Sequence, residues 1–451
     1  MSTALSTARK TSLLSAPLLR TRRLLPAAAA LLLIAGSSWG QETQDPEPVD
    51  ETPPAIVPPE GPEDSWGYSA DERPSSGAER AATVDLEAAA ARPRVERARL
   101  IGELGHRYVT GIRKLRPGIG RVEWSRQGDW MAYDKLGDRG VRGLYVGSVG
   151  AENERCLTCE QWDFRNANVL SPTWHPSGEY LVMTVQKVGK KLDLDTGKLA
   201  SPARGLHGDL WTITREGADA WQMTQVVPQG GAIMDPVFSQ EGGHLAWAER
   251  YSTKLGGRWG AWRLRIAEYK IKRRLPRLGN IETFELPWPA VAAVHGFTDD
   301  DKGLWLSIGA PAGREGGGFQ PARLDLETGK IETFKTLGTH DDLMLGIPRS
   351  GRRVWASDRD LEAPRGAVLP RRSDLWFMSE SGRRQERLTF FNEPTSPHSL
   401  GEAWISDLSW SPGGDRLLMQ VLSKDPGSGG IREDLFVLDF AEELIRQEER
   451  R

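Results

Sequence analysis

The chain has 451 residues and carries 59 lysines and arginines against 62 aspartates and glutamates, which gives a formal net charge of −3 at pH 7. This balance provides no basic surface of the kind that attracts nucleic acid, so we expect no nucleic-acid partner. The 17 tryptophans would suit stacking against sugars. Most of them fall within the strands predicted below, however, which favours packing inside the fold.

Residues 1–40 have the pattern of an export signal. Arg20, Arg22 and Arg23 precede an apolar run over residues 24–35, and small residues follow up to Gly40. An uncleaved anchor is the weaker alternative, because a helix that spans a bilayer needs about 20 apolar residues. We therefore predict a signal peptide, no membrane contact beyond this segment, and a periplasmic or secreted protein of the bacterial cell envelope.

Residues 41–95 are rich in proline, glutamate and aspartate. A segment of this composition cannot bury enough apolar surface to offset the entropy lost on ordering, so we predict a disordered linker. Within it, the alanine-rich residues 81–91 favour a short helix that ends before Pro93.

The remaining residues, 96–451, repeat one unit. In residues 408–418 an aromatic ends a strand, Ser-Pro-Gly-Gly-Asp turns the chain, and an apolar run begins the next strand, which is the pattern of a β-hairpin. Five other segments align with this one without a gap. The strand-end position reads Trp124, Trp174, Phe238, Phe297, Ile347 and Trp410, and the turn position reads Gly128, Gly178, Gly242, Asp301, Gly351 and Gly414. Intervals of roughly 50 to 60 residues suit four-stranded propeller blades with loop insertions.

Further strands complete each blade. A third strand follows every hairpin, as at residues 374–376, and a fourth follows in five repeats, as at residues 331–334. The sixth repeat lacks a fourth strand because residues 441–451 have the pattern of a charged helical tail. We predict that residues 106–110 supply it and so close the ring. The predicted fold is all-β: a six-bladed β-propeller of four-stranded antiparallel blades, closed by an N-terminal strand and expected to be a monomer.

Two turns carry a resemblance to a known family. Trp-Ser-Pro-Gly-Gly-Asp at residues 410–415 and Trp-His-Pro-Ser-Gly-Glu at residues 174–179 resemble the WD40-like repeats of TolB-type six-bladed propellers, as do the Asp-Leu-Trp strands and the closing Arg-Leu-Thr. The resemblance covers about residues 104–440 and implies the same fold, but many unrelated roles share this scaffold. TolB proteins carry a small α/β domain before the propeller, for which this chain has no room, so we do not expect a TolB-like role in the envelope-spanning Tol system.

The only two cysteines form the motif Cys156-Leu-Thr-Cys159. A zinc site would need about four ligands, and there is no second cysteine pair. Haem attachment would need a histidine where Glu160 stands. A thioredoxin-like pair would need a helix N-terminus, whereas this pair lies at a strand end. We favour a structural disulfide in an oxidising compartment over redox chemistry.

Six polar residues are candidates for a binding site. His295 and His340 precede the first strands of consecutive blades, and acidic residues occupy comparable places at Asp235, Asp341, Asp342 and Asp407. Because the loops that enter the first strands lie on one face of a propeller, we predict that these side chains converge at the mouth of the central channel. The alternative is a set of ordinary polar loop residues.

The same face carries the predicted long loops, over residues 185–207, 251–260, 307–320, 357–372 and 423–433. These loops are more basic than the whole chain, and their arginines include Arg204, Arg371 and Arg372. Binding residues concentrate on long loops held by a rigid scaffold, so we predict that this face binds an unknown, weakly acidic protein or glycan partner. A solvated rim of charges is the alternative.

These observations predict an exported, non-catalytic β-propeller that acts as a protein-binding or scaffolding module in the cell envelope, without cofactor, metal site or catalytic residues. The alternative is a metal-dependent carbohydrate-active enzyme. Oligogalacturonate lyases with similar repeats hold a cation in a histidine cluster, so the resemblance implies a channel-bound cation, although their ligand set has no residue-by-residue match here. A propeller-capped serine peptidase is excluded, because no residues remain for an α/β-hydrolase domain.

Overall fold

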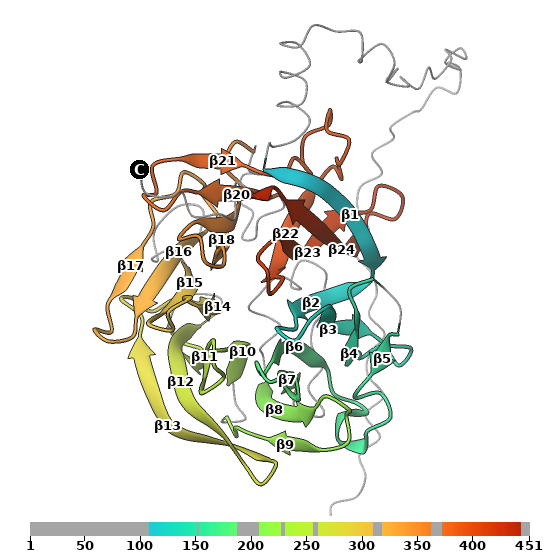
Figure 1. Cartoon of the computed structure of the whole chain (residues 1–451), viewed down its shortest axis with the longest axis vertical. Helices are drawn as coiled ribbons and strands as arrows, with labels where there is room; N and C mark the ends of the chain where they lie inside the picture. Colours follow the sequence, from blue (N-terminus) through green and yellow to red (C-terminus); the bar gives the residue numbers. More distant parts are fainter. Residues whose placement is uncertain are drawn as a thin grey trace, which may run out of the picture. The chain divides into compact units, whose positions relative to one another are not determined.

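The computed structural model describes residues 108–150, 153–186, 207–226, 231–255, 260–309, 318–361 and 372–442. These residues form six four-stranded antiparallel sheets arranged as the blades of a propeller (Figure 1). The predicted all-β fold with six blades is therefore confirmed. The predicted signal peptide at residues 1–40, the linker at residues 41–95 and nearly all of the predicted C-terminal helix lie outside the described residues.

The strands follow one another from the centre of the ring outward in each blade. Blade one contains β2 (Ile119–Trp124), β3 (Trp130–Leu136), β4 (Arg142–Ser148) and β5 (Arg155–Cys156). After the short 3-10 helix η1 (Trp162–Phe164), blade two contains β6 (Val169–Trp174), β7 (Tyr180–Gln186), β8 (Gly208–Thr214) and β9 (Ala220–Gln222). Blade three contains β10 (Ala232–Phe238), β11 (His244–Ser252), β12 (Ala261–Lys272) and β13 (Leu275–Glu285).

The other three blades repeat this order. Blade four contains β14 (Ala292–Phe297), β15 (Gly303–Gly309), β16 (Phe319–Asp325) and β17 (Ile331–Thr333). Blade five contains β18 (Asp341–Gly346), β19 (Arg353–Ser357), β20 (Asp374–Met378) and β21 (Gln385–Arg387). Blade six contains β22 (Ala403–Trp410), β23 (Arg416–Lys424) and β24 (Ile431–Phe440), and its fourth strand is β1 (Val109–Pro117) from the other end of the propeller.

Each hairpin of the repeat joins the first and second strands of a blade, as predicted. Its turn places one residue in the left-handed region of the backbone, where glycine carries no steric cost. Gly414 has φ 74°, and Asp301 takes the corresponding place in blade four with φ 56°. The carboxylate of Asp301 also accepts a hydrogen bond of 2.7 Å from the backbone N–H of Gln240 in blade three. The aspartate thus ties two neighbouring blades together.

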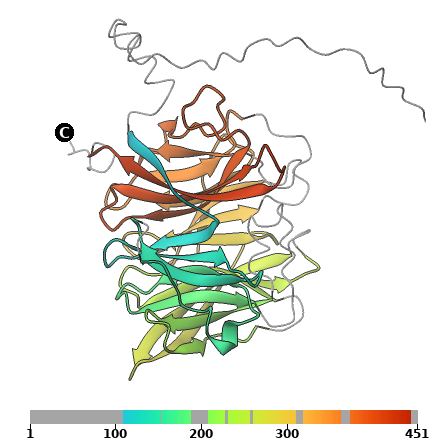
Figure 2. The ribbon, with the colours of Figure 1, turned by 90° about the vertical axis from the view of Figure 1, so that its right-hand side faces the viewer.

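Blade six is closed by β1, which lies beside β24 (Figures 1 and 2). The predicted closure is confirmed, but the predicted position, residues 106–110, was too early, because the strand runs over Val109–Pro117. Two bulges explain the error, since the pairing shifts between Val109 and Gly111 and again between Lys114 and Arg116. The bulges break the alternation of apolar and polar residues on which strand prediction depends.

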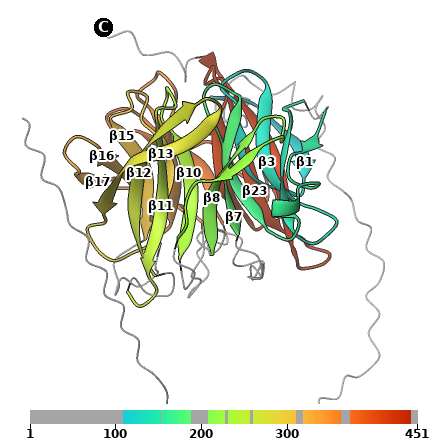
Figure 3. The same ribbon diagram turned by 90° about the horizontal axis from the view of Figure 1, so that it is seen from below.

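The core lies between neighbouring sheets, which pack face to face around the ring (Figure 3). Trp124, Trp247, Trp262 and Trp355 are among the largest fully enclosed side chains, so the prediction that most tryptophans pack between blades is confirmed for them. Trp162 in η1 is an exception, with 81% of its surface exposed. Among the described residues, no helix is both long enough and apolar enough to cross a membrane.

We predict that the ring depends on β1. A chain that begins at residue 118 loses β1, which leaves the edge of β24 without a hydrogen-bonded neighbour and uncovers apolar side chains beside it. Its melting temperature should therefore fall by about 10 °C or more, or the protein should aggregate. A chain that begins at residue 105 keeps β1 and should melt like the full-length protein. Circular dichroism melting of the three chains checks this, and equal melting temperatures would contradict it.

Candidate functional site

The first strands of the six blades line the central channel. Each contains a bulge, where its pairing with the second strand shifts: between Ile119 and Val122, Leu170 and Thr173, Met234 and Val237, Val294 and Gly296, Asp342 and Leu345, and Ile405 and Asp407. A bulge turns the side chains near it away from the regular alternation of a strand. Polar residues that lie at or beside these bulges therefore meet near the axis of the propeller.

The charged centre of the channel is Arg121 of β2. Its Nη1 lies 2.7 Å from Asp235 Oδ1 in blade three and 3.6 Å from Asp407 Oδ1 in blade six. Asp407 also accepts a hydrogen bond of 2.7 Å from the backbone N–H of Val122. One arginine in blade one thus connects two blades that are far apart in the sequence. The repeat pattern predicts that Asp235 and Asp407 converge, but it does not reveal Arg121 as their common partner.

Burial makes this ion pair important for stability. Only 9% of the Arg121 side chain and 1% of the Asp235 side chain are exposed. Burial by itself would lower the pKa of Arg121, but the nearby carboxylates of Asp235 and Asp407 dominate and raise the pKa above its ordinary value. Removing one member of such a buried pair leaves a charge without compensation, which is strongly destabilising.

A second polar contact joins blades four and five. His295 Nε2 lies 2.8 Å from Ser307 Oγ and 3.3 Å from Asp342 Oδ1. Burial alone would raise the pKa of Asp342, but the hydrogen bond and the charge of His295 outweigh it and hold the pKa well below the ordinary value. Asp342 is therefore a carboxylate, and it holds the imidazole in a fixed orientation.

His340 and Asp341 do not line the channel cavity. The His340 ring packs edge-on against Phe319, with centroids 5.1 Å apart, and burial lowers its pKa. Asp341 accepts a hydrogen bond of 2.9 Å from the indole N–H of Trp355, and burial raises its pKa. His340 comes just before β18 and Asp341 is its first residue, whereas the bulge of this strand follows Asp342.

Two of the three predicted arginines, Arg204 and Arg371, lie outside the described residues. Arg372 is described, and 34% of its side chain is exposed. Its Nη2 lies 3.6 Å from Glu402 Oε1, and the Nζ of Lys424 lies 3.8 Å from the other oxygen of the same carboxylate. Two cations thus share one glutamate where the chain enters the first strand of blade six.

The predicted disulfide between Cys156 and Cys159 is present. Cys156 ends β5, and Cys159 follows in the loop that leads to η1. The backbone N–H of Leu144 donates a hydrogen bond of 2.9 Å to Thr158 Oγ1, between the two cysteines. The short loop that the disulfide closes is thus hydrogen-bonded to β4, next to the two-residue strand β5.

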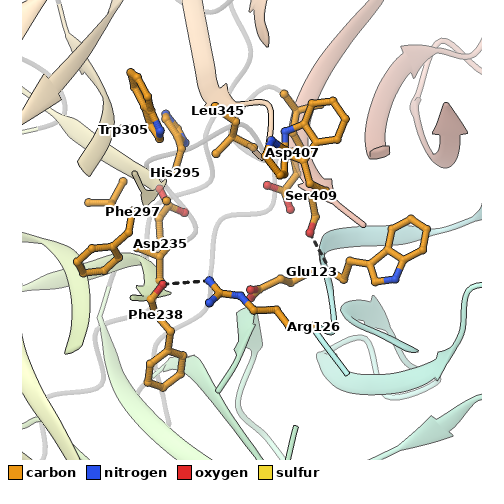
Figure 4. A pocket seen from close by; sticks show the side chains of 18 of the residues that line it. Glu123, Arg126, Asp235, Phe238, His295, Phe297, Trp305, Leu345, Asp407 and Ser409 are labelled. Carbon is orange, nitrogen blue, oxygen red and sulfur yellow. Dashed lines mark hydrogen bonds between the residues drawn. The ribbon is translucent and has the colours of Figure 1, made fainter. Parts of the chain in front are cut away.

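A cavity of about 520 Å³ extends from the bulges to the tight turns between first and second strands. We call the side of the propeller with these turns the turn face, and the opposite side, with the loops that enter the first strands, the loop face. Asp235, His295 and Asp407 lie in the cavity wall, and Figure 4 shows them pointing toward the same space from three blades. The cavity thus opens toward the turn face, whereas the sequence had led us to expect these residues at the loop face.

Arg126 crosses the cavity near the turn face. Its guanidinium donates hydrogen bonds of 2.5 Å and 3.2 Å to the carbonyls of Gln240 and Ser239 in blade three. A longer contact of 3.5 Å reaches the carbonyl of Phe238 (Figure 4). Arg126 therefore bridges blades one and three on the turn side of the cavity, and Arg121 connects the same two blades through Asp235.

Glu123 is the most unusual acid in the cavity. Its Oε2 accepts a hydrogen bond of 3.0 Å from the backbone N–H of Trp174 in blade two. Burial raises its pKa to about 7, although hydrogen bonds and the charge of Arg126 lower it in part. Glu123 is therefore an acid in the cavity wall that changes charge near neutral pH.

Arg121, Glu123 and Arg126 are not among the residues that the sequence predicts for the site. The repeat alignment contained a signal for Arg121 in the column three residues before the strand-end position. Four of its six members are polar or charged, namely Arg121, Ser171, Asp235 and Asp407, and the other two are Val294 and Met344. Opposite charges in one column of a ring point toward the same axis. Nothing in the alignment marks Arg126, whose partners are backbone carbonyls.

The polar side chains of the channel can bind polar groups, but Arg121, Asp235 and Asp407 are paired with one another, as are His295 and Asp342. Within the described ranges, no group of three or more histidine, cysteine, aspartate and glutamate side chains is placed to hold a metal ion. His295 and Asp342 supply two groups of the kind that metals use, with Ser307 as a third neighbour. Whether the predicted residues bind a ligand stays a prediction.

We predict that Arg121→Met destabilises the protein by about 3–5 kcal/mol, because it leaves two carboxylates buried without a counter-charge. Urea unfolding at pH 7 measures the change. Arg383→Met, which removes an exposed arginine from the turn face, is the matched control and should change stability by less than about 0.5 kcal/mol. An equal change in the free energy of unfolding for the two substitutions would show that the ion pairs of Arg121 do not stabilise the fold.

We predict that Glu123 destabilises the fold above neutral pH. Its folded pKa of about 7 lies above the ordinary 4.5, so its favourable contribution is complete below pH 4.5 and is lost as the pH rises through 7. Glu123→Gln should therefore match the wild type at pH 4.5 and exceed it at pH 8, by at most about 3 kcal/mol. Unfolding at both pH values tests this, with the exposed Glu179→Gln as control. A gain that does not depend on pH would rule out the titration of Glu123.

No family model matches the chain, and no curated protein matches its sequence. Similar solved structures include TolB from Acinetobacter baumannii, which is 14% identical, with a TM-score of 0.40 over 74% of this chain and 65% of that one. A putative TolB from Agrobacterium tumefaciens is 12% identical, with a TM-score of 0.44 over 73% of this chain and 97% of that one. An oligogalacturonate lyase from Vibrio parahaemolyticus is 11% identical, with a TM-score of 0.43 over 74% of this chain and 94% of that one.

This chain covers less than two thirds of the A. baumannii protein. At these identities the likeness concerns the fold alone. The strand pairing of this chain by itself establishes the six blades. TolB propellers, which its turn motifs resemble, are among the solved structures similar to it.

Proposed function

We propose that this protein is an exported, non-catalytic β-propeller that serves as a protein-binding or scaffolding module in the cell envelope. The observation that carries the proposal is that the charged side chains of the channel are paired with one another. Arg121 is paired with Asp235 and Asp407, and Asp342 with His295. A general acid or base must reach a substrate proton. These groups instead connect one blade to another, which favours a rigid support for the surface loops.

The disulfide supports an extracytoplasmic location. Disulfides persist in oxidising compartments and are rare in the cytosol. Both cysteines of the chain are joined in one disulfide, and residues 1–40 have the pattern of an export signal. A periplasmic or secreted protein would satisfy both observations.

The partner is proposed to bind the loop face. Among the described residues there, Arg372 and Lys424 both lie close to the carboxylate of Glu402, so this group of three side chains carries one net positive charge. The exposed fractions of the two basic side chains are 34% and 53%. A weakly acidic protein or glycan would complement this surface, and its charge would raise the rate of association.

The test is site-specific photo-crosslinking in living cells. A photoreactive residue at position 424 should crosslink a specific partner, and the same residue at position 383, on the turn face, should not. For the second part of the test, the photoreactive residue stands at a loop-face position other than 372 and 424. The yield of its crosslink should fall by about tenfold or more when Lys424→Glu and Arg372→Glu are introduced together, because the surface would then repel an acidic partner. Equal crosslinking from both faces, or none from either, would contradict the proposal.

A metal-dependent carbohydrate-active enzyme is the second candidate, and the contact between His295 and Asp342 inside the channel is the observation that favours it. Titration of the purified protein with Mn²⁺ or Ca²⁺ separates the two functions. Stoichiometric binding that His295→Ala abolishes would favour the enzyme. Binding that is absent, or the same in both proteins, would favour the scaffold.

A further inference from the structure

The third and fourth strands of blade three form a hairpin that extends beyond the rest of that blade. β13 has 11 residues, whereas the outermost strands of blades one, two, four and five have two or three. β11 pairs with β12 only as far as His244 opposite Glu268, but β12 and β13 stay paired up to Lys272 opposite Leu275. Residues 270–277 therefore form a two-stranded ribbon, which reaches outward past β9 (Figure 1).

The ribbon has an apolar side toward the protein and a basic side toward solvent. Ile271 and Leu278 pack against the core between blades two and three. Because neighbouring residues of a strand point to opposite faces, the residues between them point away from that core. Five basic side chains are exposed on the ribbon: Lys270, Lys272, Arg273, Arg274 and Arg277.

Only a small part of this charge is balanced by carboxylates. Within the described ranges, a single ion pair involves the five basic side chains, and it joins Lys270 to Glu268. No acidic residue lies in residues 270–277. The next acidic residue of β13 is Glu282, which lies opposite Ile266 in the inner half of the hairpin. The ribbon thus keeps several positive charges, although the whole chain has a formal net charge of −3.

The basic residues are poorly suited to the local structure that they occupy. Arg273 and Arg274 form the two-residue turn, with φ 52° and 66°. Such a turn favours asparagine and glycine, because both of its residues lie in the left-handed region. Lys270 also lies directly opposite Arg277, and like charges in that arrangement repel one another. Residues that disfavour their own local structure are expected at functional sites, so we assign these side chains a role in binding.

We propose that residues 270–277 bind the surface of a membrane that contains anionic phospholipids. A protruding tip can reach a flat surface, and clustered lysines and arginines are attracted to anionic headgroups. Leu275, which is 43% exposed beside the turn, would enter the boundary of the acyl chains. An anionic glycan suits the ribbon less well, because residues 270–277 include no aromatic side chain for a sugar to stack on.

The membrane would lie on the turn face of the propeller. The third and fourth strands of a blade join on the same side as its first and second strands, which is opposite to the loop face. A partner on the loop face and a membrane at the ribbon can therefore be bound together. The sequence predicts no membrane contact beyond residues 1–40. We depart from that prediction because the pairing of β12 with β13 gathers five charges on one exposed ribbon.

The test is co-sedimentation of the purified protein with lipid vesicles. The vesicles consist of phosphatidylcholine alone or of an equal mixture with phosphatidylglycerol. Residues 1–40 are left out, because their apolar run would itself bind a membrane, and every strand of the propeller is retained. The protein should bind the mixed vesicles at least about tenfold more tightly than the neutral ones. Added salt should weaken this binding, because it screens the charges.

Arg273→Asn together with Arg274→Gly removes two charges and supplies the residues that this turn prefers. The double variant should melt at or above the wild-type temperature, yet bind the mixed vesicles about tenfold more weakly or less. The matched control is Lys330→Gln together with Arg383→Gln, which removes two exposed charges from the β16–β17 and β20–β21 turns of the same face. It should bind like the wild type.

Weaker binding without a lower melting temperature in the ribbon variant would support the proposal, because a purely structural role would not separate the two. Absence of binding to the mixed vesicles would overturn it, as would equal weakening in the ribbon variant and the control. Binding to soluble polyglutamate or heparin without binding to the vesicles would also overturn it, and would indicate an acidic polymer as the partner.

Discussion

Strand β1 pairs with β24 from Val109 opposite Phe440 to Pro117 opposite Asp434, and this pairing joins the two ends of the ring. The other five blades are each built from consecutive strands, so only blade six depends on segments that are far apart in the chain. Ile112 of β1 packs against the core of blade six, and Leu115 packs against the core shared with blade one. The closing strand therefore completes the sheet of blade six and also covers apolar surface on both faces of that sheet.

Closure brings the first strands of all six blades around one axis, and their bulges turn polar groups toward it. Arg121 then meets Asp235 and Asp407, although these residues are distant in the sequence. Such a network is favourable only while every charge is paired, because the side chains of Arg121 and Asp235 are buried from the water that would otherwise stabilise their charges. The propeller and its channel charges thus depend on each other. For a binding module this is useful, since rigid blades hold the surface loops in place.

The two arginine sites of the molecule differ in how their charge is balanced. Arg121 lies between two carboxylates, and 9% of its side chain is exposed. Arg323 and Arg353 share a cleft between blades four and five, where the rings of Trp305 and Phe334 fix the position of Arg353 and the carboxylates of Glu380 and Glu332 act on its charge. Both arrangements are balanced within the protein, and we assign a structural role to the charges of the channel.

The sequence by itself determined the number of blades, the turns and the disulfide. These features depend on residues that are neighbours in the sequence: the glycine found in five of the six turns, and Cys156 and Cys159, which are three positions apart. Only the tertiary structure decided the exact closing strand, the partner of Asp235 and Asp407, and the side of the ring on which the cavity opens. Bulges in β1 and in the six first strands are the reason, because a single extra residue reverses the direction of the side chains that follow.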